Sequence, residues 1–390
     1  MTREPRQRIP LDNAATSWPK PESVYQAVDD YQRTIGAPFA RGGYDAAIEV
    51  QSAVNQCRAM AARLLGVGKP ERVIFTFNAT DSLNLAIFGL LRPGDHVVTS
   101  ALEHNSISRP LRALEQRGTI ELTRLIPDEG ELLTVAQVKG ACRPQTRLIC
   151  LLHASNVTGT IQPIEAIGDF ARERGIRFLV DAAQTAGVLP LSFDELPVDL
   201  LACAGHKGLL GPLGTGLLCL AQGLEAELEP IRMGGTGTLS ELDVQPRSLP
   251  DRYESGNHNV AGLYGLRAGL QYLLDRGVQQ IRDEELALMS RLRDELKTLS
   301  GIRVHGCQNS DRQIGVVSIS SELYEPHTLA TLLAQEYGIE TRAGLHCAPG
   351  MHTWLGTKDT GGTVRMSSGP FTTPEQIDST IRAMGELHKV

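Results

Sequence analysis

The sequence lacks any apolar run long enough to cross a membrane, and its first residues carry charges where a secretory signal would need an apolar core. It has no cluster of lysine and arginine that would form a basic arm, and its net charge at pH 7 is -7. That charge argues against nucleic acid or an anionic membrane surface as the main partner. We therefore expect a cytoplasmic protein that binds neither nucleic acid nor a membrane.

The cysteines include no Cys-x-x-Cys pair, and their number, seven, is odd. Both features fit a reducing compartment better than a disulfide framework. The chain also lacks internal repeats and low-complexity tracts. We expect most of the cysteines to be structural, because they lie in or beside apolar segments: Cys142, Cys150, Cys203, Cys219 and Cys307.

What is present is an alternation of short apolar segments, rich in valine, isoleucine and leucine, with helical patterns. Such segments suit strands buried on both faces, and the alternation predicts an α/β fold with a largely parallel sheet wrapped by helices. The predicted strands are 73–77, 96–100, 148–153, 177–182, 199–203 and 215–220. The predicted helices among them are 81–90, 106–116 and 163–173.

The length of 390 residues exceeds the usual limit of about 250 to 300 residues for one core, so we expect two domains. The larger would span 15–255, and a smaller α+β domain would combine 1–14 with 256–390. In the second part we predict helices at 259–274, 278–299, 328–337 and from Thr373 onward, strands at 314–320, 339–342 and 363–367, and linkers at 233–258 and 344–362.

One lysine, Lys207, lies in a glycine-rich turn between two apolar segments. Desolvation at the mouth of a buried sheet lowers the pKa of such a lysine, which allows its amine to form a Schiff base with an aldehyde cofactor. Asp181 ends the apolar run 177–182, where a carboxylate would meet the pyridinium nitrogen of pyridoxal phosphate. A lone lysine of this kind usually solvates a loop, but its pairing with Asp181 favours the cofactor site.

Eight motifs occur in the order typical of one family: LDNAAT (11–16), NATDSLN (78–84), EHNS (103–106), SNVTG (155–159), DAAQ (181–184), AGHK (204–207), RAGLHCAP (342–349) and VRMSSGPFTT (364–373). Over nearly its whole length the chain resembles the group II cysteine desulfurases of the class V aminotransferase group. The resemblance implies a fold type I homodimer with a sheet of the seven-stranded type. It also implies pyridoxal phosphate as cofactor, and sulfur transfer from L-cysteine that leaves L-alanine.

The resemblance implies the cofactor contacts. Ala79 and Thr80 would hold the phosphate at a helix amino end, although Thr80 alone fits a helix cap equally well. His104 would stack on the pyridine ring and act as an acid or base, its alternative being a loop histidine. Asn156 and Gln184 would bond the phenolic oxygen. The full predicted cofactor set is Ala79, Thr80, His104, Asn156, Asp181, Gln184, His206, Lys207 and Asn257.

Cys347 would distinguish this chain from a transaminase. The resemblance implies that its thiolate, on a mobile and exposed loop, attacks the substrate sulfur and becomes a persulfide, with Arg342 and His346 stabilising the thiolate. A metal site of His346, Cys347 and His352 is the alternative, but no second Cys or His cluster has zinc spacing. The predicted catalytic residues are therefore Lys207, Cys347 and His104.

Arg365 matches the family arginine that clamps the amino-acid carboxylate, because a guanidinium offers two parallel N–H bonds that lysine cannot reproduce. By itself an arginine near a strand end is more often a surface residue. Asn156 and Arg342 are the further predicted substrate contacts. No metal is predicted.

The chain departs from the family pattern at two phosphate contacts. Ala204 stands where a serine is usual, and Asn257 stands where a threonine reaches the phosphate of the neighbouring subunit. Segment 234–238 is expected to form part of that cross-dimer wall. These changes concern cofactor affinity, not the class of reaction.

Other functions remain open at this stage. Selenocysteine lyase or cysteine sulfinate lyase activity would use the same scaffold with a different need for the loop thiol, and an epimerase or transaminase is a third possibility. A cofactor-free scaffold is disfavoured, because burying so many polar groups in a cleft costs stability without purpose. A sulfur-acceptor protein is a possible partner, and selenocysteine is the alternative substrate.

Overall fold

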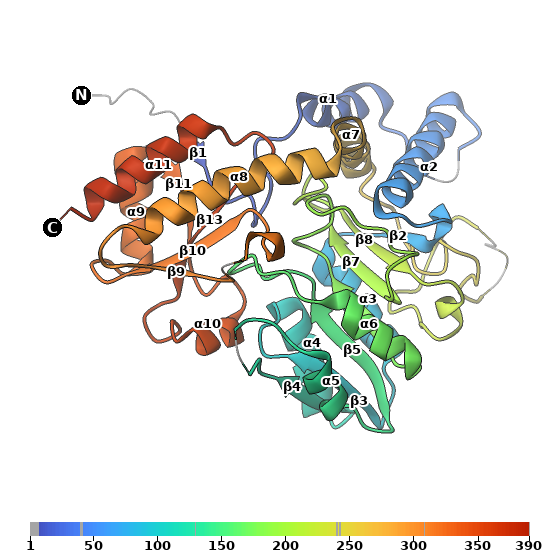
Figure 1. Ribbon diagram of the computed structural model, residues 1–390. Coiled ribbons are helices and arrows are strands. Elements are labelled where there is room, and N and C mark those ends of the chain that lie inside the picture. The colour runs from blue at the N-terminus through green and yellow to red at the C-terminus, as the bar shows by residue number, and fades with distance from the viewer. Residues whose placement is uncertain are drawn as a thin grey trace.

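The computed structural model describes residues 8–39, 42–128, 130–238, 241, 243–307 and 309–389. Its largest sheet has seven strands with helices on both faces (Figure 1). In spatial order these are β2 (Val73–Thr76), β8 (Gly216–Leu220), β7 (Leu200–Ala204), β6 (Arg177–Asp181), β5 (Thr146–Leu152), β3 (Asp95–Ser100) and β4 (Ile120–Leu125). Strand β8 runs antiparallel to both of its neighbours, and the other adjacent pairs are parallel. The predicted mostly parallel α/β sheet is confirmed.

Side chains of this sheet alternate between two cores, as the two-residue period of a strand requires. Val97 belongs to one core and Val98 to the other. Residues of α2 (Asp45–Leu65), α6 (Ile164–Glu173) and α7 (Val260–Arg276) share the core of Val98. Residues of α3 (Ala79–Leu90) and α4 (Asn105–Gln116) share the core of Val97. The sheet is therefore covered on both faces, which explains its near-continuous apolar strands.

A second sheet follows β12 (Arg342–Gly344), β13 (Thr363–Ser367), β10 (Val316–Ser321) and β9 (Ile302–His305), and a two-stranded pair joins β1 (Ile9–Pro10) to β11 (Ile339–Glu340). A separate core beneath it contains Leu11 and residues of α8 (Val278–Lys297), α9 (Pro326–Tyr337) and α11 (Pro374–Leu387). Figure 1 shows α8 leading from α7 toward this second sheet. Because α7 shares the core of the large sheet, the exact division into 15–255 and 1–14 with 256–390 stays a prediction.

Several elements were not predicted: α1 (Glu22–Asp30), α2, β4, α5 (Val135–Ala141) and β9. The predicted linker 344–362 is wrong in part, because α10 (Pro349–Leu355) lies inside it. Pro349 suits the first helical turn, and Gly356, at φ 71°, ends the helix in the left-handed region. Within the described ranges no helix is both long and apolar enough to span a bilayer.

Candidate active site

A cavity of about 210 Å³ lies where β5, β6 and β7 end, at Leu152, Asp181 and Ala204. Ligands of open α/β sheets collect at this edge. The residues of the predicted site that line the cavity are Ala79, Thr80, His104, Asn156, Asp181, Gln184, His206, Lys207, Arg342 and Arg365. The fold thus brings together side chains that are up to 286 positions apart, from Ala79 to Arg365.

Lys207 and Asp181 face this cavity from adjacent strand ends. The pKa of Lys207 is lowered to about 8. Burial is the main cause, Arg365 and Arg342 act in the same direction, and Asp181 opposes them. Burial also raises the pKa of Asp181, while the Ala183 N–H donates to its Oδ1 at 2.9 Å and Lys207 favours the ionised form. An amine with a pKa near 8 is partly neutral at physiological pH and can act as a nucleophile.

Two helix amino ends meet at one side of the cavity. Asn78 caps α3 by accepting the Asp81 N–H at 2.9 Å, and Thr80 lies in the first turn behind it. The Thr80 hydroxyl is 2.7 Å from the hydroxyl of Ser106, in the first turn of α4. Converging hydroxyls and helix N–H groups suit an anion such as phosphate. Sequence reasoning missed Ser106, although the EHNS motif contained it.

His104 caps the amino end of α4, where its Nδ1 accepts the Ser106 N–H at 3.1 Å. The proton of the neutral ring is therefore on Nε2. Burial lowers the pKa of His104 to about 4, and the positive charge of Lys207 adds to that effect. The ring is neutral near pH 7, with a proton on Nε2 that it can donate and with its Nδ1 lone pair already bonded to the Ser106 N–H.

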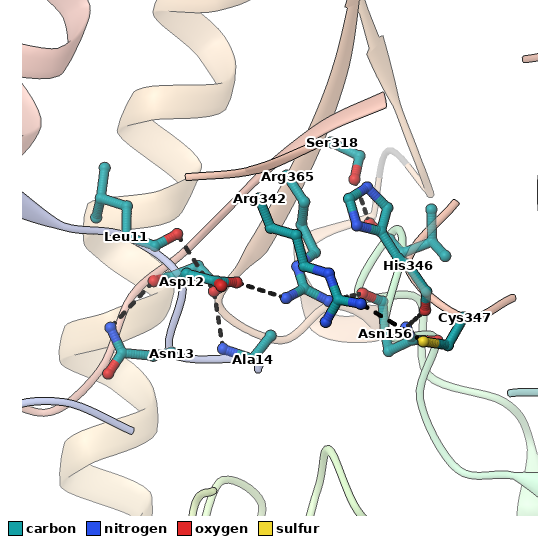
Figure 2. A network of polar contacts seen from close by, with 12 residues as sticks. Leu11, Asp12, Asn13, Ala14, Asn156, Ser318, Arg342, His346, Cys347 and Arg365 are labelled. Atoms are coloured by element: carbon teal, nitrogen blue, oxygen red, sulfur yellow. Dashed lines mark hydrogen bonds and ion pairs between the residues drawn. The ribbon is translucent and has the colours of Figure 1, made fainter. Parts of the chain in front are cut away.

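Strand pairing places the two predicted substrate arginines side by side. Arg342 on β12 is opposite Arg365 on the antiparallel β13 (Figure 2). Arg365 is only 1% exposed, its Nη1 donates to the Asn156 carbonyl at 3.0 Å, and its Nη2 donates to Asp12 Oδ1 at 2.6 Å. Asp12 lies in the LDNAAT motif, yet its contact with Arg365 was not predicted.

Cys347 lies between β12 and α10, and its Sγ is 3.4 Å from Nη2 of Arg342. The carbonyl of His346 accepts a bond from Asn156 Nδ2 at 2.6 Å, and the carbonyl of Cys347 accepts the Asn105 N–H at 2.7 Å. His346 and Cys347 have φ values of 47° and 59°, which non-glycine residues rarely adopt. The expectation of an exposed loop is wrong, because Cys347 is only partly exposed and its backbone is held on both sides.

The predicted role of His346 in stabilising the thiolate stays a prediction. Its Nε2 is 3.0 Å from the Thr363 hydroxyl, and burial lowers its pKa to about 2. A neutral ring supplies no positive charge, whereas the guanidinium of Arg342 contacts the sulfur directly. The rings of His346 and His352 lie 5.4 Å apart, but the described part of the chain contains no group of three or more metal-binding side chains.

Gln184 and His206 join the amino-terminal segment to the cavity. Gln184 Nε2 donates to the Ala14 carbonyl at 3.0 Å, and the His206 carbonyl accepts the Ser17 N–H at 3.0 Å. Burial lowers the pKa of His206 to about 4. Both residues therefore border the cavity and also fix its wall, Gln184 through its side chain and His206 through its backbone carbonyl.

Comparison with known proteins identifies the family to which this architecture belongs. The family model named aminotransferase class-V matches residues 9–380. The chain belongs to this family. A protein named probable cysteine desulfurase from Methanothermobacter thermautotrophicus is 32% identical over 98% of the chain and 95% of its own length, and one named cysteine desulfurase from Haloferax volcanii is 30% identical over 96% and 88%.

Solved structures agree with the family assignment. The apo structure of cysteine desulfurase from Thermococcus onnurineus is similar at a TM-score of 0.91, with 31% identity over 98% of this chain and 94% of that one. The cysteine desulfurase CsdA from Escherichia coli gives a TM-score of 0.88, with 28% identity over 98% and 96%. The predicted resemblance to class V cysteine desulfurases is confirmed.

One predicted cofactor contact of this class-V protein, Asn257, does not line the cavity, and neither does the predicted catalytic Cys347. Asn257 is exposed and lines a different pocket, with Phe77 and Arg232. The glycine-rich segment 234–238 lies beside it, since the Gly256 N–H donates to the Gly235 carbonyl at 2.8 Å. Their predicted position across a dimer therefore stays a prediction. Ala204 does line the cavity, and it contributes no hydroxyl there.

Proposed function

We propose that this class-V protein is a pyridoxal phosphate-dependent cysteine desulfurase that converts L-cysteine to L-alanine and receives the sulfur on Cys347 as a persulfide. The observation that carries this proposal is the position of Cys347. Its sulfur lies 3.4 Å from the guanidinium of Arg342, and Arg342 also lines the cavity that contains Lys207. A transaminase reaction needs no such thiol.

The side chains of the cavity fit pyridoxal phosphate. Lys207 offers an amine whose pKa is lowered to about 8, Asp181 offers a buried carboxylate, and Thr80 lies at the amino end of α3. These three groups match the aldehyde, the ring nitrogen and the phosphate, respectively. When bound, the cofactor withdraws electrons from the α-carbon of an amino acid, which makes the α-proton removable.

The residues of the chain then have separate tasks. The guanidinium of Arg365 binds the substrate carboxylate, and the neutral ring of His104 excludes water from one face of the cavity. The neutral amine of Lys207 accepts the α-proton at Nζ. Arg342 stabilises negative charge on Cys347 Sγ, which attacks the substrate sulfur. The new bond joins the two sulfur atoms, the carbon–sulfur bond breaks, and its electron pair stays with the three-carbon product.

The test is the Cys347→Ala variant, assayed for alanine release from L-cysteine, L-selenocysteine and L-cysteine sulfinate. We expect release from L-cysteine to fall by about 100-fold or more, because the nucleophile is lost. In the unaltered protein, peptide mass spectrometry after incubation with L-cysteine should find one added sulfur atom on Cys347. Cys307→Ala, another partly exposed cysteine, is the matched control and should keep full turnover.

Unchanged turnover of L-cysteine in Cys347→Ala would refute the assigned nucleophile. If the unaltered protein and Cys347→Ala both release alanine faster from L-selenocysteine or L-cysteine sulfinate than from L-cysteine, the protein is instead a lyase on the same scaffold. Borohydride reduction of each loaded protein should fix the cofactor to Lys207, which checks that the variant binds it. An adduct on another residue would remove the basis of the whole proposal.

We further propose that the protein is a cytoplasmic homodimer that passes its sulfur to an acceptor protein. The support for a dimer is that large apolar side chains are exposed near Asn257 and segment 234–238. Leu213, Met233 and Val244 are 67%, 71% and 70% exposed. Such a surface is typical of an interface between chains, and a partner there would border Asn257 and segment 234–238.

A further inference from the structure

The carboxylate of Asp12 is fixed against Arg365 by the backbone around it. The segment before Ala14 crosses the end of β13, where the Ser367 N–H donates to the Leu11 carbonyl at 2.7 Å and the Ala14 N–H donates to the Ser367 hydroxyl at 2.8 Å. Asp12 itself forms a parallel bridge with Ser367. Figure 2 shows the carboxylate directed at the guanidinium, with the Oδ1–Nη2 distance of 2.6 Å.

Arg365 does not need Asp12 to reach its position. Its strand is paired on both sides, with β10 and with β12, and its Nη1 is already bonded to the Asn156 carbonyl at 3.0 Å. The guanidinium is buried, so the main contribution of Asp12 is its negative charge. The Nε of Arg365 is buried and has no partner among the described residues, which leaves donors for a second anion.

The two neighbouring arginines, Arg365 and Arg342, differ in their charged neighbours. Asp12 compensates Arg365, whereas Arg342, opposite it on β12, contacts the sulfur of Cys347. An arriving carboxylate therefore meets a guanidinium whose charge is already balanced by a carboxylate a few ångströms away. Two anions on one buried cation repel each other strongly, because the surroundings screen them less than water does.

We propose that Asp12 is an internal counter-ion that lowers the affinity of Arg365 for amino-acid carboxylates. This inference rests on the proposed function, in which Arg365 binds the substrate carboxylate. Asp12 acts through the charge of Arg365 and is not a catalytic residue. Because L-alanine has the same carboxylate as L-cysteine, a weaker clamp allows the product to leave as readily as the substrate enters.

The test is Asp12→Asn in the cofactor-loaded protein. The amide has the same shape, and its oxygen still accepts the Nη2 bond, but the charge is gone. We expect the Kd of L-alanine, measured from the cofactor absorbance, to fall by about tenfold, and the KM of L-cysteine to fall while kcat does not rise. Asp12→Ser should shift the Kd in the same direction. High salt should shrink the difference, since the Asp12 side chain is 35% exposed.

Two controls separate charge from structure. Ethylamine lacks the carboxylate of L-alanine, so its binding should be equal in both proteins. Glu340→Gln removes a carboxylate from the groove that Asp12 also lines, but Glu340 pairs with Arg8 at 2.6 Å. This variant should bind L-alanine as the unaltered protein does.

A merely structural role for Asp12 predicts the opposite sign, namely weaker L-alanine binding in Asp12→Asn. Weaker or unchanged binding there, together with weaker binding in Arg365→Lys, overturns the inference and leaves the proposed function intact. If Arg365→Lys binds L-alanine normally, Arg365 does not bind the substrate carboxylate. The inference about Asp12 then fails, and the proposed function loses this role of Arg365.

Discussion

Lys207, His104 and His346 all have lowered pKa values, and burial is the main cause for each. The apolar segments around Lys207 indicated its burial in advance. Nothing near His346 in the sequence indicated that the fold would bury its ring and so lower its pKa. The sequence therefore indicated the lowered pKa of Lys207, whose burial comes from neighbouring apolar segments, but not that of His346, whose burial comes from segments far away in the chain.

Glu254 provides a prediction at this level. Its Oε1 is 2.6 Å and its Oε2 2.8 Å from the two Nη atoms of Arg58, and Oε1 also accepts the Phe75 N–H at 2.6 Å. Both side chains are buried. Glu254→Ala leaves the buried guanidinium of Arg58 without its counter-ion, although its Nη1 still donates to the Val73 carbonyl at 2.5 Å. We therefore expect the free energy of unfolding to fall by about 3–5 kcal/mol in urea denaturation.

The matched control is Glu121→Ala, which breaks an ion pair with Arg143 whose side chains are 61% and 46% exposed. Exposed pairs contribute about 0–1 kcal/mol, so this variant should stay close to the unaltered protein. Equal losses in the two variants would contradict the assigned importance of the buried pair.

Among the helices and strands, those of the large sheet were the easiest to predict. Segments such as 148–153 are apolar throughout, because helices cover both faces of the sheet. The longest unpredicted element, α2, mixes small apolar and polar residues, and it forms because α7 and the sheet bury one of its faces. The helix α10 was hidden in a glycine-rich stretch, where Pro349 begins it and Gly356 ends it.

The contact of α10 with the end of β3 provides a second prediction. A Cβ on Gly350 would lie 2.0 Å from the Ala101 carbonyl oxygen, so Gly350→Ala must shift the start of α10 away from Ala101, and the adjacent Cys347 with it. We expect sulfur transfer from L-cysteine to fall by at least about tenfold, while cofactor loading at Lys207 is unchanged.

Gly140 in α5 is the control for this change, because a Cβ there meets nothing within 4 Å. Gly140→Ala should leave sulfur transfer intact and slightly favour its helix. Normal sulfur transfer in Gly350→Ala would mean that the position of Cys347 does not depend on the packing of α10 against Ala101.

In the molecule as a whole, the site combines residues of both sheets. Lys207 and Asp181 come from the large sheet, whereas Arg342, Cys347 and Arg365 come from the second sheet and the loop after β12. The amino-terminal segment completes the wall through Asp12 and Ala14. The cavity is therefore bounded by parts of the chain that lie far apart in sequence.

Buried titratable groups predict how the stability of the cofactor-free protein varies with pH. Burial lowers the pKa of His153 to about 4 and of His346 to about 2, from 6.5, so the stability they contribute is lost as pH falls below about 6.5. Burial raises the pKa of Glu103 and Glu285 from 4.5 to about 8, so the stability they contribute is lost as pH rises toward 8. Further histidines with pKa values of about 4 are His104, His206, His305 and His352.

We expect the urea midpoint to be highest at about pH 6.5 and to fall on both sides, more steeply toward acid because more groups act there. Glu285→Gln should flatten the alkaline side, since the amide does not titrate. An alkaline decline of the same slope in that variant would show that other groups cause it.

The amino-acid sequence by itself determined all strands of the large sheet except β4, the presence of Lys207 and Asp181 in one cavity, and the family, because these depend on apolar strands and on motifs that are contiguous in the chain. Only the tertiary structure decided that burial lowers the pKa of His346, that Cys347 is held beside Arg342, and that Asp12 pairs with Arg365. Those features depend on which strands lie side by side and on how deeply each group is buried. Charge and burial act through space, and contacts between distant segments cannot be obtained from local sequence patterns.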